Sequence, residues 1–81
     1  MKDQELLKRL SLEPRVMLGK PVIKGTRLTV EYIIGRLAHG ATTADLTTEY
    51  EGLTSDDIVA CLLFAKRSLS DTEYLPLAEA S

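Results

Sequence analysis

The sequence predicts a small, mainly α-helical domain, in which three helices with a helix-turn-helix outline follow a short helix and a short β element. Apolar residues recur with helical spacing, and good N-caps precede them, over residues of about 30–39, 43–50 and 55–69. Prolines and glycines interrupt residues 10–28, where no long helix fits. With 81 residues, the chain has room for one domain, 1–69, followed by an acidic tail, 70–81.

The first 28 residues predict a short helix followed by a short β element. Residues 4–9 form the helix, with Asp3 as its N-cap, because the leucines around them cluster on one side. Pro14 and Pro21 then exclude a continuing helix. The runs Leu-Ser-Leu and Pro-Val-Ile between them favour a small hairpin or paired extended strands.

Threonines mark the starts of the three helices that follow. Thr29 is a good N-cap for the first of them. Thr42 is followed three residues later by Asp45, and Thr54 by Asp57. Both pairs are Asp variants of the capping box, in which the two residues satisfy each other's backbone N–H groups.

The last helix carries more apolar side chains than a single stripe accommodates. One row is available to pack on helix 30–39: Ile58, Cys61, Leu62, Ala65 and Leu69. A second set, formed by Val59, Leu63 and Phe64, points elsewhere and needs the N-terminal segment, another subunit or a partner. Because a chain this short buries little core and its one cysteine cannot form an intrachain disulfide, we expect self-association as a homodimer.

Charge divides the chain into a basic and an acidic part. Residues 1–36 carry a net charge of +4 and residues 37–81 a net charge of −6, so the two parts are expected to meet different partners. In the acidic tail, Tyr74, Leu75 and Leu77 are candidate anchors on a basic protein partner. The alternative is that the tail frays or packs back over Phe64, and both remain open.

The helix-turn-helix outline leaves two interpretations of the last helix. It could enter the DNA major groove, but it opens with Asp56 and Asp57, which disfavour approach to phosphates. We therefore favour a structural role in a three-helix core.

The segment from Gly19 to Arg27 is the better candidate for nucleic-acid binding. Lys20, Lys24 and Arg27 flank glycines that let a backbone approach a phosphate. The alternative, which we favour, is ordinary turn chemistry, in which Gly25 supplies a positive φ and Thr26 and Arg27 bond locally.

No catalytic, metal or cofactor site is expected. His39, before Gly40, suits a helix C-terminus, and Cys61 suits an apolar core. One His and one Cys make no zinc site, so we expect neither an enzyme nor a small-molecule substrate. The charged N-terminus and the lack of a run of about 20 apolar residues predict a cytoplasmic protein that is not a membrane protein.

Two stretches resemble the domain of unknown function 433 family. Residues 19–30, Gly-Lys-Pro-Val-Ile-Lys-Gly-Thr-Arg-Leu-Thr-Val, resemble its signature G-K-P-[VC]-I-x-G-T-R-[IL]-x-V. Residues 50–58, Tyr-Glu-Gly-Leu-Thr-Ser-Asp-Asp-Ile, resemble its Y-P-G-L-T-x-E-D-I. The resemblance covers roughly residues 13–65. Glu51 stands where the family often has proline, and Leu18 where glycine is common.

The resemblance implies a homeodomain-like or winged-helix-like fold and a VapB-type antitoxin role. Such a protein would bind and neutralise a PIN-like ribonuclease toxin and could bind its operator DNA. The family has no established catalytic residues to transfer to this sequence. The alternative function is a dimeric interaction or DNA-binding module without a toxin.

Overall fold

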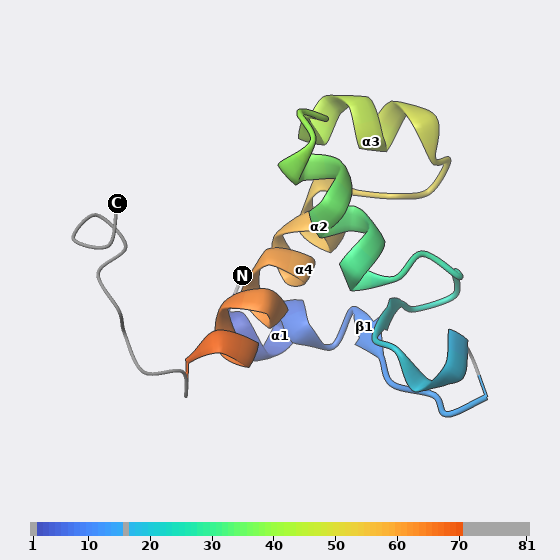
Figure 1. The fold of residues 1–81 in the computed structure, drawn as a ribbon, viewed down its shortest axis with the longest axis vertical. Helices are drawn as coiled ribbons and strands as arrows, with labels where there is room; N and C mark the ends of the chain where they lie inside the picture. Colours follow the sequence, from blue (N-terminus) through green and yellow to red (C-terminus); the bar gives the residue numbers. More distant parts are fainter. Residues whose placement is uncertain (1, 16, 71–81) are drawn as a thin grey trace.

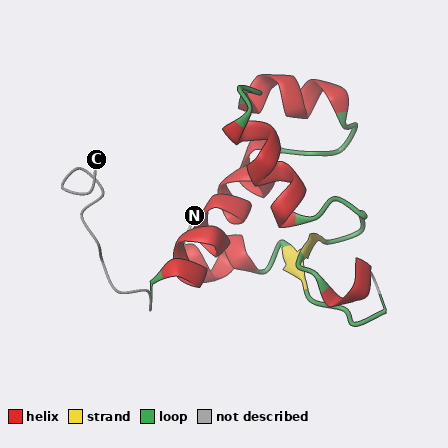
Figure 2. Ribbon diagram, in the orientation of Figure 1, coloured by secondary structure: helices red, strands yellow, loops and turns green. Residues whose placement is uncertain are grey.

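A computed structural model describes residues 2–15 and 17–70 of the chain. The elements along the chain are α1 (Asp3–Leu7), β1 (Leu10–Ser11), the 3₁₀ turn η1 (Met17–Gly19), β2 (Val22–Ile23), α2 (Val30–Ala38), α3 (Thr43–Glu49) and α4 (Ser55–Leu69). Figures 1 and 2 show the helices packed together, with the small β ribbon at one end. The predicted mainly helical fold with a short hairpin is confirmed. None of the described helices is long and apolar enough to cross a membrane.

The predicted caps begin the three main helices. The Thr29 hydroxyl accepts a hydrogen bond from the Tyr32 backbone N–H at 3.0 Å. Capping boxes with bonds in both directions start α3 at Thr42 and α4 at Thr54. The bounds of α4 are those predicted, whereas α2 and α3 each end one residue earlier. These starts follow from contacts within four residues, which sequence alone specifies.

The prediction for α1 was wrong at both ends. Asp3 lies inside the helix and Lys2 occupies the cap position, where no side chain caps the backbone. The helix also ends at Leu7, because the chain then turns into the β ribbon. There the Arg9 carbonyl accepts a hydrogen bond from the Lys24 backbone N–H at 2.9 Å. This long-range bond holds extended backbone where helical spacing would have continued.

The two short strands form the predicted antiparallel pair. Leu10 lies opposite Ile23, and Ser11 opposite Val22. The chain leaves β2 through a tight turn at Gly25, whose φ of +77° strains any residue with a Cβ. The Thr26 hydroxyl donates to the Ile23 carbonyl at 2.7 Å and accepts from the Leu28 N–H at 3.0 Å. The turn therefore connects β2 directly to the start of α2.

The core lies between β2, α2, α3 and α4. Its buried residues are Ile23, Val30, Ile33, Leu46, Leu53, Ile58 and Cys61. Ile33, Leu46 and Cys61 have no exposed surface, so one central side chain from each of the three main helices anchors the cluster. Cys61 is thus a core residue, as its apolar surroundings in the sequence indicated.

Helix α1 lies antiparallel against α4, beside the C-terminal part of α4 in Figure 1. Arg9 and Asp57 join one end of this pair at 3.2 Å, and Arg67 and Asp3 approach to 3.8 Å at the other. With α1 and α2 both packed on α4, the outer side of α4 is left uncovered by the described residues. The apolar row of α4 therefore packs into the domain only in part, since Leu62 and Leu69 are 48% and 65% exposed.

Candidate functional site

The turn between β2 and α2 carries two of the three predicted nucleic-acid contacts. Lys24 and Arg27 line an open cavity of about 420 Å³. The rest of its lining comes from both strands and the turn: Ser11, Glu13, Val22, Gly25 and Thr26. Within residues 2–15 and 17–70, neither Lys24 nor Arg27 forms an ion pair, so both cations are available to an anion. The Glu13 carboxylate on the same cavity reduces the local positive charge.

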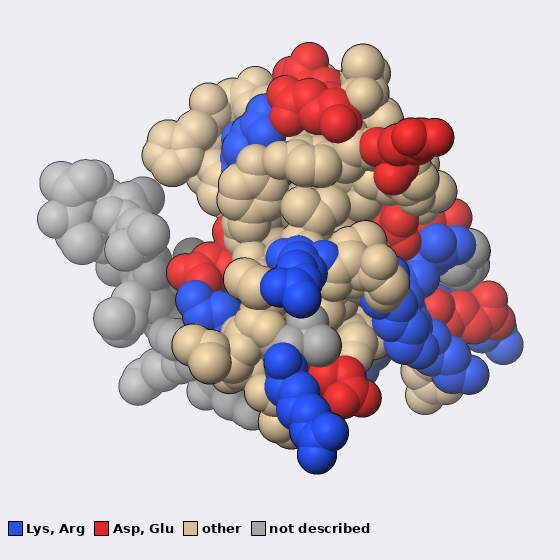
Figure 3. Space-filling view, turned by 90° about the vertical axis from the view of Figure 1, so that its right-hand side faces the viewer, with Lys and Arg blue, Asp and Glu red and all other residues tan. Residues whose placement is uncertain are grey.

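Lys20, the third predicted contact, is placed differently. Its Nζ lies 2.9 Å from Oε1 of Glu31 on α2, and both side chains are exposed. Lys20 does not line the cavity of Lys24 and Arg27. The three basic residues are therefore a pair and a separate, partly neutralised lysine. In Figure 3, most Lys and Arg side chains lie over the lower half, interspersed with several acidic ones, and the upper end carries further acidic side chains.

The start of α4 is bonded to Arg9, just after α1, by an ion pair that was not predicted from the sequence. The Asp57 carboxylate, buried to 7% exposure, accepts from the Thr54 N–H at 3.0 Å and from the Arg9 guanidinium at 3.2 Å. Arg9 also lies 3.6 Å from Asp56. Both acidic residues are thus engaged with the end of α1. This arrangement is that of a structural helix start, which agrees with the favoured interpretation of α4.

An apolar groove runs between α1, β1 and α4. It encloses about 200 Å³ and is lined by Leu7, Leu10, Ser11, Leu12, Pro21 and Phe64. Phe64 is half-buried and also contacts the core cluster. On the rim, Leu12 is 61% exposed. The groove therefore offers an apolar site that ends in an accessible leucine.

The interface residues predicted on α4 do not share one face. Val59 is 44% exposed on the outer side, Leu63 is half-buried, and Phe64 lines the groove. Sequence spacing alone grouped them, because it does not show which sides of α4 are covered by α1 and α2. The other predicted interface residues, Tyr74, Leu75 and Leu77, lie outside the described residues.

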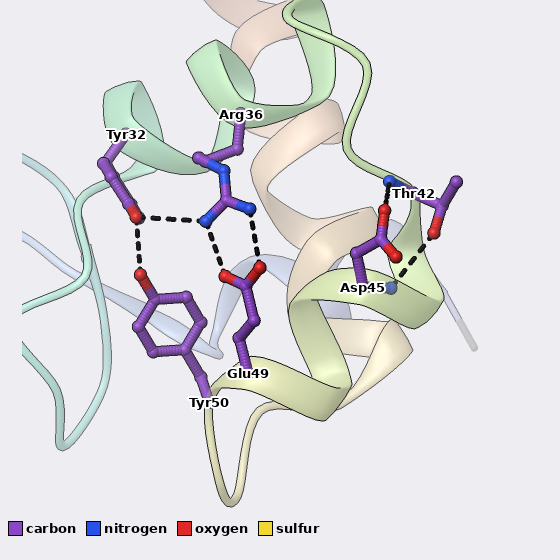
Figure 4. Close-up of polar contacts among 6 residues, drawn as sticks. All are labelled: Tyr32, Arg36, Thr42, Asp45, Glu49 and Tyr50. Atoms are coloured by element: carbon purple, nitrogen blue, oxygen red, sulfur yellow. Dashed lines mark hydrogen bonds and ion pairs between the residues drawn. The ribbon is translucent and has the colours of Figure 1, made fainter.

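A polar cluster joins α2 to α3 (Figure 4), and sequence analysis did not find it. Arg36 donates to both carboxylate oxygens of Glu49 at 2.7 and 2.9 Å, and to the Tyr32 hydroxyl at 3.2 Å. The hydroxyls of Tyr32 and Tyr50 are hydrogen-bonded to each other. The bond from Arg36 lowers the pKa of Glu49, and the bond from Tyr50 lowers the pKa of Tyr32. The cluster fixes the position of α3 on α2, and the only sequence signal was the opposite charge of Arg36 and Glu49.

The two residues considered for catalysis have structural surroundings. The Nδ1 of His39 lies 2.7 Å from the Gly35 carbonyl oxygen, to which it can donate at the end of α2. Burial raises the pKa of the Cys61 thiol to about 12, which disfavours the nucleophilic thiolate. In the part of the chain that the structure describes, no three His, Cys, Asp or Glu residues gather where a metal ion could be held.

Comparison with solved structures gives one crystal structure of similar fold, a DUF433 member protein from Anabaena variabilis ATCC 29413 at 2.00 Å resolution. The TM-score is 0.72 and the sequence identity 28%, over 79% of this chain and 63% of that one. The chain thus spans less than two thirds of that protein. No match is found among the curated proteins.

The model of the family described as "Protein of unknown function (DUF433)" matches residues 10–65. The match runs from β1 through the basic turn, α2 and α3 into the C-terminal half of α4. Since it covers more than half of the 81 residues and the fold agrees with that of a solved member, this chain belongs to the DUF433 family.

Proposed function

We propose that this chain is a non-catalytic, antitoxin-like protein that binds and neutralises a PIN-like ribonuclease toxin. The observation that carries the proposal is the apolar groove between α1, β1 and α4, with Phe64 in its lining and Leu12 on its rim. The family resemblance supplies the class of partner. The groove supplies a surface on which such a partner can dock.

The size of the groove suits an apolar side chain of a protein partner. Its volume of about 200 Å³ lies below the roughly 300–1,000 Å³ of most small-molecule sites. Ser11 is the one polar residue in its lining, so little there would orient a polar ligand. Protein interfaces are commonly anchored by one or two apolar side chains buried in pockets of this kind.

Charge supports the same class of partner. A ribonuclease that binds RNA needs basic residues, and the α3 end of this chain is mainly acidic (Figure 3). Asp45 and Glu51 at that end are exposed. Because this acidic end lies apart from the groove, opposite charge on the two proteins would speed their encounter and would not contribute to docking in the groove itself.

The test is co-expression with the product of an adjacent ribonuclease-like reading frame. We expect the wild-type chain to co-purify with that product and to restore growth. Leu12→Glu should weaken both effects at least tenfold, because it places a charge on the groove rim. Leu18→Glu is the matched control, since Leu18 is 96% exposed on the same ribbon and does not line the groove.

Capture of the toxin by Leu12→Glu at wild-type strength would remove the groove from the proposal. Absence of any ribonuclease-like partner, together with normal folding of the chain, would favour the alternative of a DNA-binding or dimeric module.

Operator DNA binding is a second candidate function, supported by Lys24 and Arg27 on the β2–α2 turn, which form no ion pair with any described residue. We expect Lys24→Ala with Arg27→Ala to abolish a gel-retardation shift. The slope of log K against log salt concentration should also become shallower, by about 0.9 for each phosphate that the variant no longer neutralises. Lys20→Ala should have a smaller effect, because Glu31 already neutralises that charge. Altered sequence preference in Asp56 variants, with normal binding by the double variant, would instead identify α4 as the reader.

A further inference from the structure

We propose that the outer face of α4 pairs with the same face of a second copy of this chain, with the two helices antiparallel about a two-fold axis. The outer face consists of Val59, Leu62, Lys66 and Leu69. This surface is separate from the groove, so the inference goes beyond toxin binding and does not depend on it.

The spacing of the outer face is that of a helix-pairing seam. Its members are separated by three, four and three residues, which is the alternation of the a and d positions in a heptad. The three apolar members are 44%, 48% and 65% exposed, although α4 is packed on two other sides by α1 and α2. Within the described residues, therefore, the fold leaves three apolar side chains of one stripe, interrupted by Lys66, without a cover.

The charges along α4 select a second copy and set its direction. Asp56 lies in the first turn, and Lys66 and Arg67 lie in the last turn. In a parallel pair, each Lys66 would face Lys66 of the second copy, and like charges repel. In an antiparallel pair with Val59 opposite Leu62 of the second copy, Asp56 comes next to Lys66 instead. The two-fold axis creates this contact twice.

Asp56 has room for the additional partner. Its side chain is 47% exposed, and Arg9 approaches it only to 3.6 Å, whereas Arg9 bonds Asp57 more closely at 3.2 Å. The Lys66 side chain is exposed. Because α4 has 15 residues and spans about 22 Å, the contact is short. The pair is therefore expected to be weak, with a dissociation constant in the micromolar range.

The test is analytical ultracentrifugation of the full chain without toxin or DNA. We expect a monomer–dimer equilibrium for the wild type and for Leu18→Glu, a control that changes an exposed leucine elsewhere. Leu62→Glu should shift the equilibrium at least tenfold toward monomer without lowering the melting temperature. A wild type that stays monomeric at high micromolar concentration would overturn the inference, as would a Leu62→Glu variant that dimerises normally.

A charge exchange tests the direction of the pair. Asp56→Lys and Lys66→Asp should each weaken self-association, because each creates two like-charge contacts across the axis. An equal mixture of the two variants should dimerise again, since both contacts in the mixed dimer join Lys to Asp. Loss of a fold cannot produce such a rescue. If the mixture stays as monomeric as its components, the antiparallel pairing is wrong.

Discussion

Replacing Asp57 by Ala should be among the most damaging single changes outside the apolar core. The side chain performs two tasks at once. One carboxylate oxygen accepts from the Thr54 N–H at 3.0 Å and closes the capping box of α4. The other accepts from Arg9 at 3.2 Å and joins the end of α1 to the start of α4. Because Asp57 is only 7% exposed, water does not readily replace these bonds.

The expected loss is about 2 kcal/mol of unfolding free energy. The capping contact contributes about 1 kcal/mol. A hydrogen bond between charged groups contributes roughly 1.5–3 kcal/mol, and we take about 1 because the Arg9 side chain is 33% exposed. A loss of this size lowers the melting temperature of a domain of 60–100 residues by about 8–16 °C. It would also remove a large share of a total stability on the order of 5 kcal/mol.

Asp45→Ala is the matched control. Asp45 closes the same kind of capping box at α3, where the Thr42 N–H donates to it at 2.8 Å, but it is exposed and bonds no arginine among the described residues. Urea unfolding followed by circular dichroism should show a clearly smaller loss for Asp45→Ala at an unchanged m value. If the two variants lose the same stability, the Arg9 contact contributes nothing to the stability of the domain. Arg9→Met should lose only the part of the Asp57→Ala stability loss that exceeds the contribution of the capping box.

Three other changes have defined outcomes. Leu18→Gly should stabilise the chain by about 0.5–1 kcal/mol in thermal melts, because Leu18 has a φ of +58° and its side chain is 96% exposed. Relief of roughly 1–2 kcal/mol of left-handed strain outweighs the added entropy of the unfolded chain. An unchanged or lower stability would contradict this. Stability should fall as the pH drops below about 4, since hydrogen bonds lower the folded-state pKa of Asp45 and Glu49, and Glu49→Gln should flatten part of that fall in melts across the acid range. Removing residues 70–81 should weaken toxin capture and leave the melting temperature unchanged, because we expect the acidic tail to bind a basic partner. A large drop in melting temperature would show that the tail is part of the domain. Full capture of the toxin by the truncated chain would show that the tail does not contribute to binding.

The starts of the three main helices and the chemistry of the turn at Gly25 follow from local sequence alone. Thr29, Thr42 and Thr54 bond to backbone groups three residues ahead, so their effect does not depend on the rest of the fold. Gly25 likewise has the positive φ that its turn requires. The family signature lies in the same local segments, and the family assignment followed from it. Interactions between residues a few positions apart can therefore be predicted from the sequence.

Which surfaces remain open depends on the tertiary packing. The sides of α4 that are covered depend on where α1 lies, and Arg9 and Asp57, 48 residues apart, help to hold it there. For this reason Leu62 is exposed and Phe64 lines a groove, although both belong to one unbroken apolar run. The same applies to Lys20, which pairs with Glu31 and does not line the cavity of Lys24 and Arg27. Helical periodicity gives the direction of each side chain around its own axis, but the neighbours that bury it come from distant segments, which local spacing does not encode.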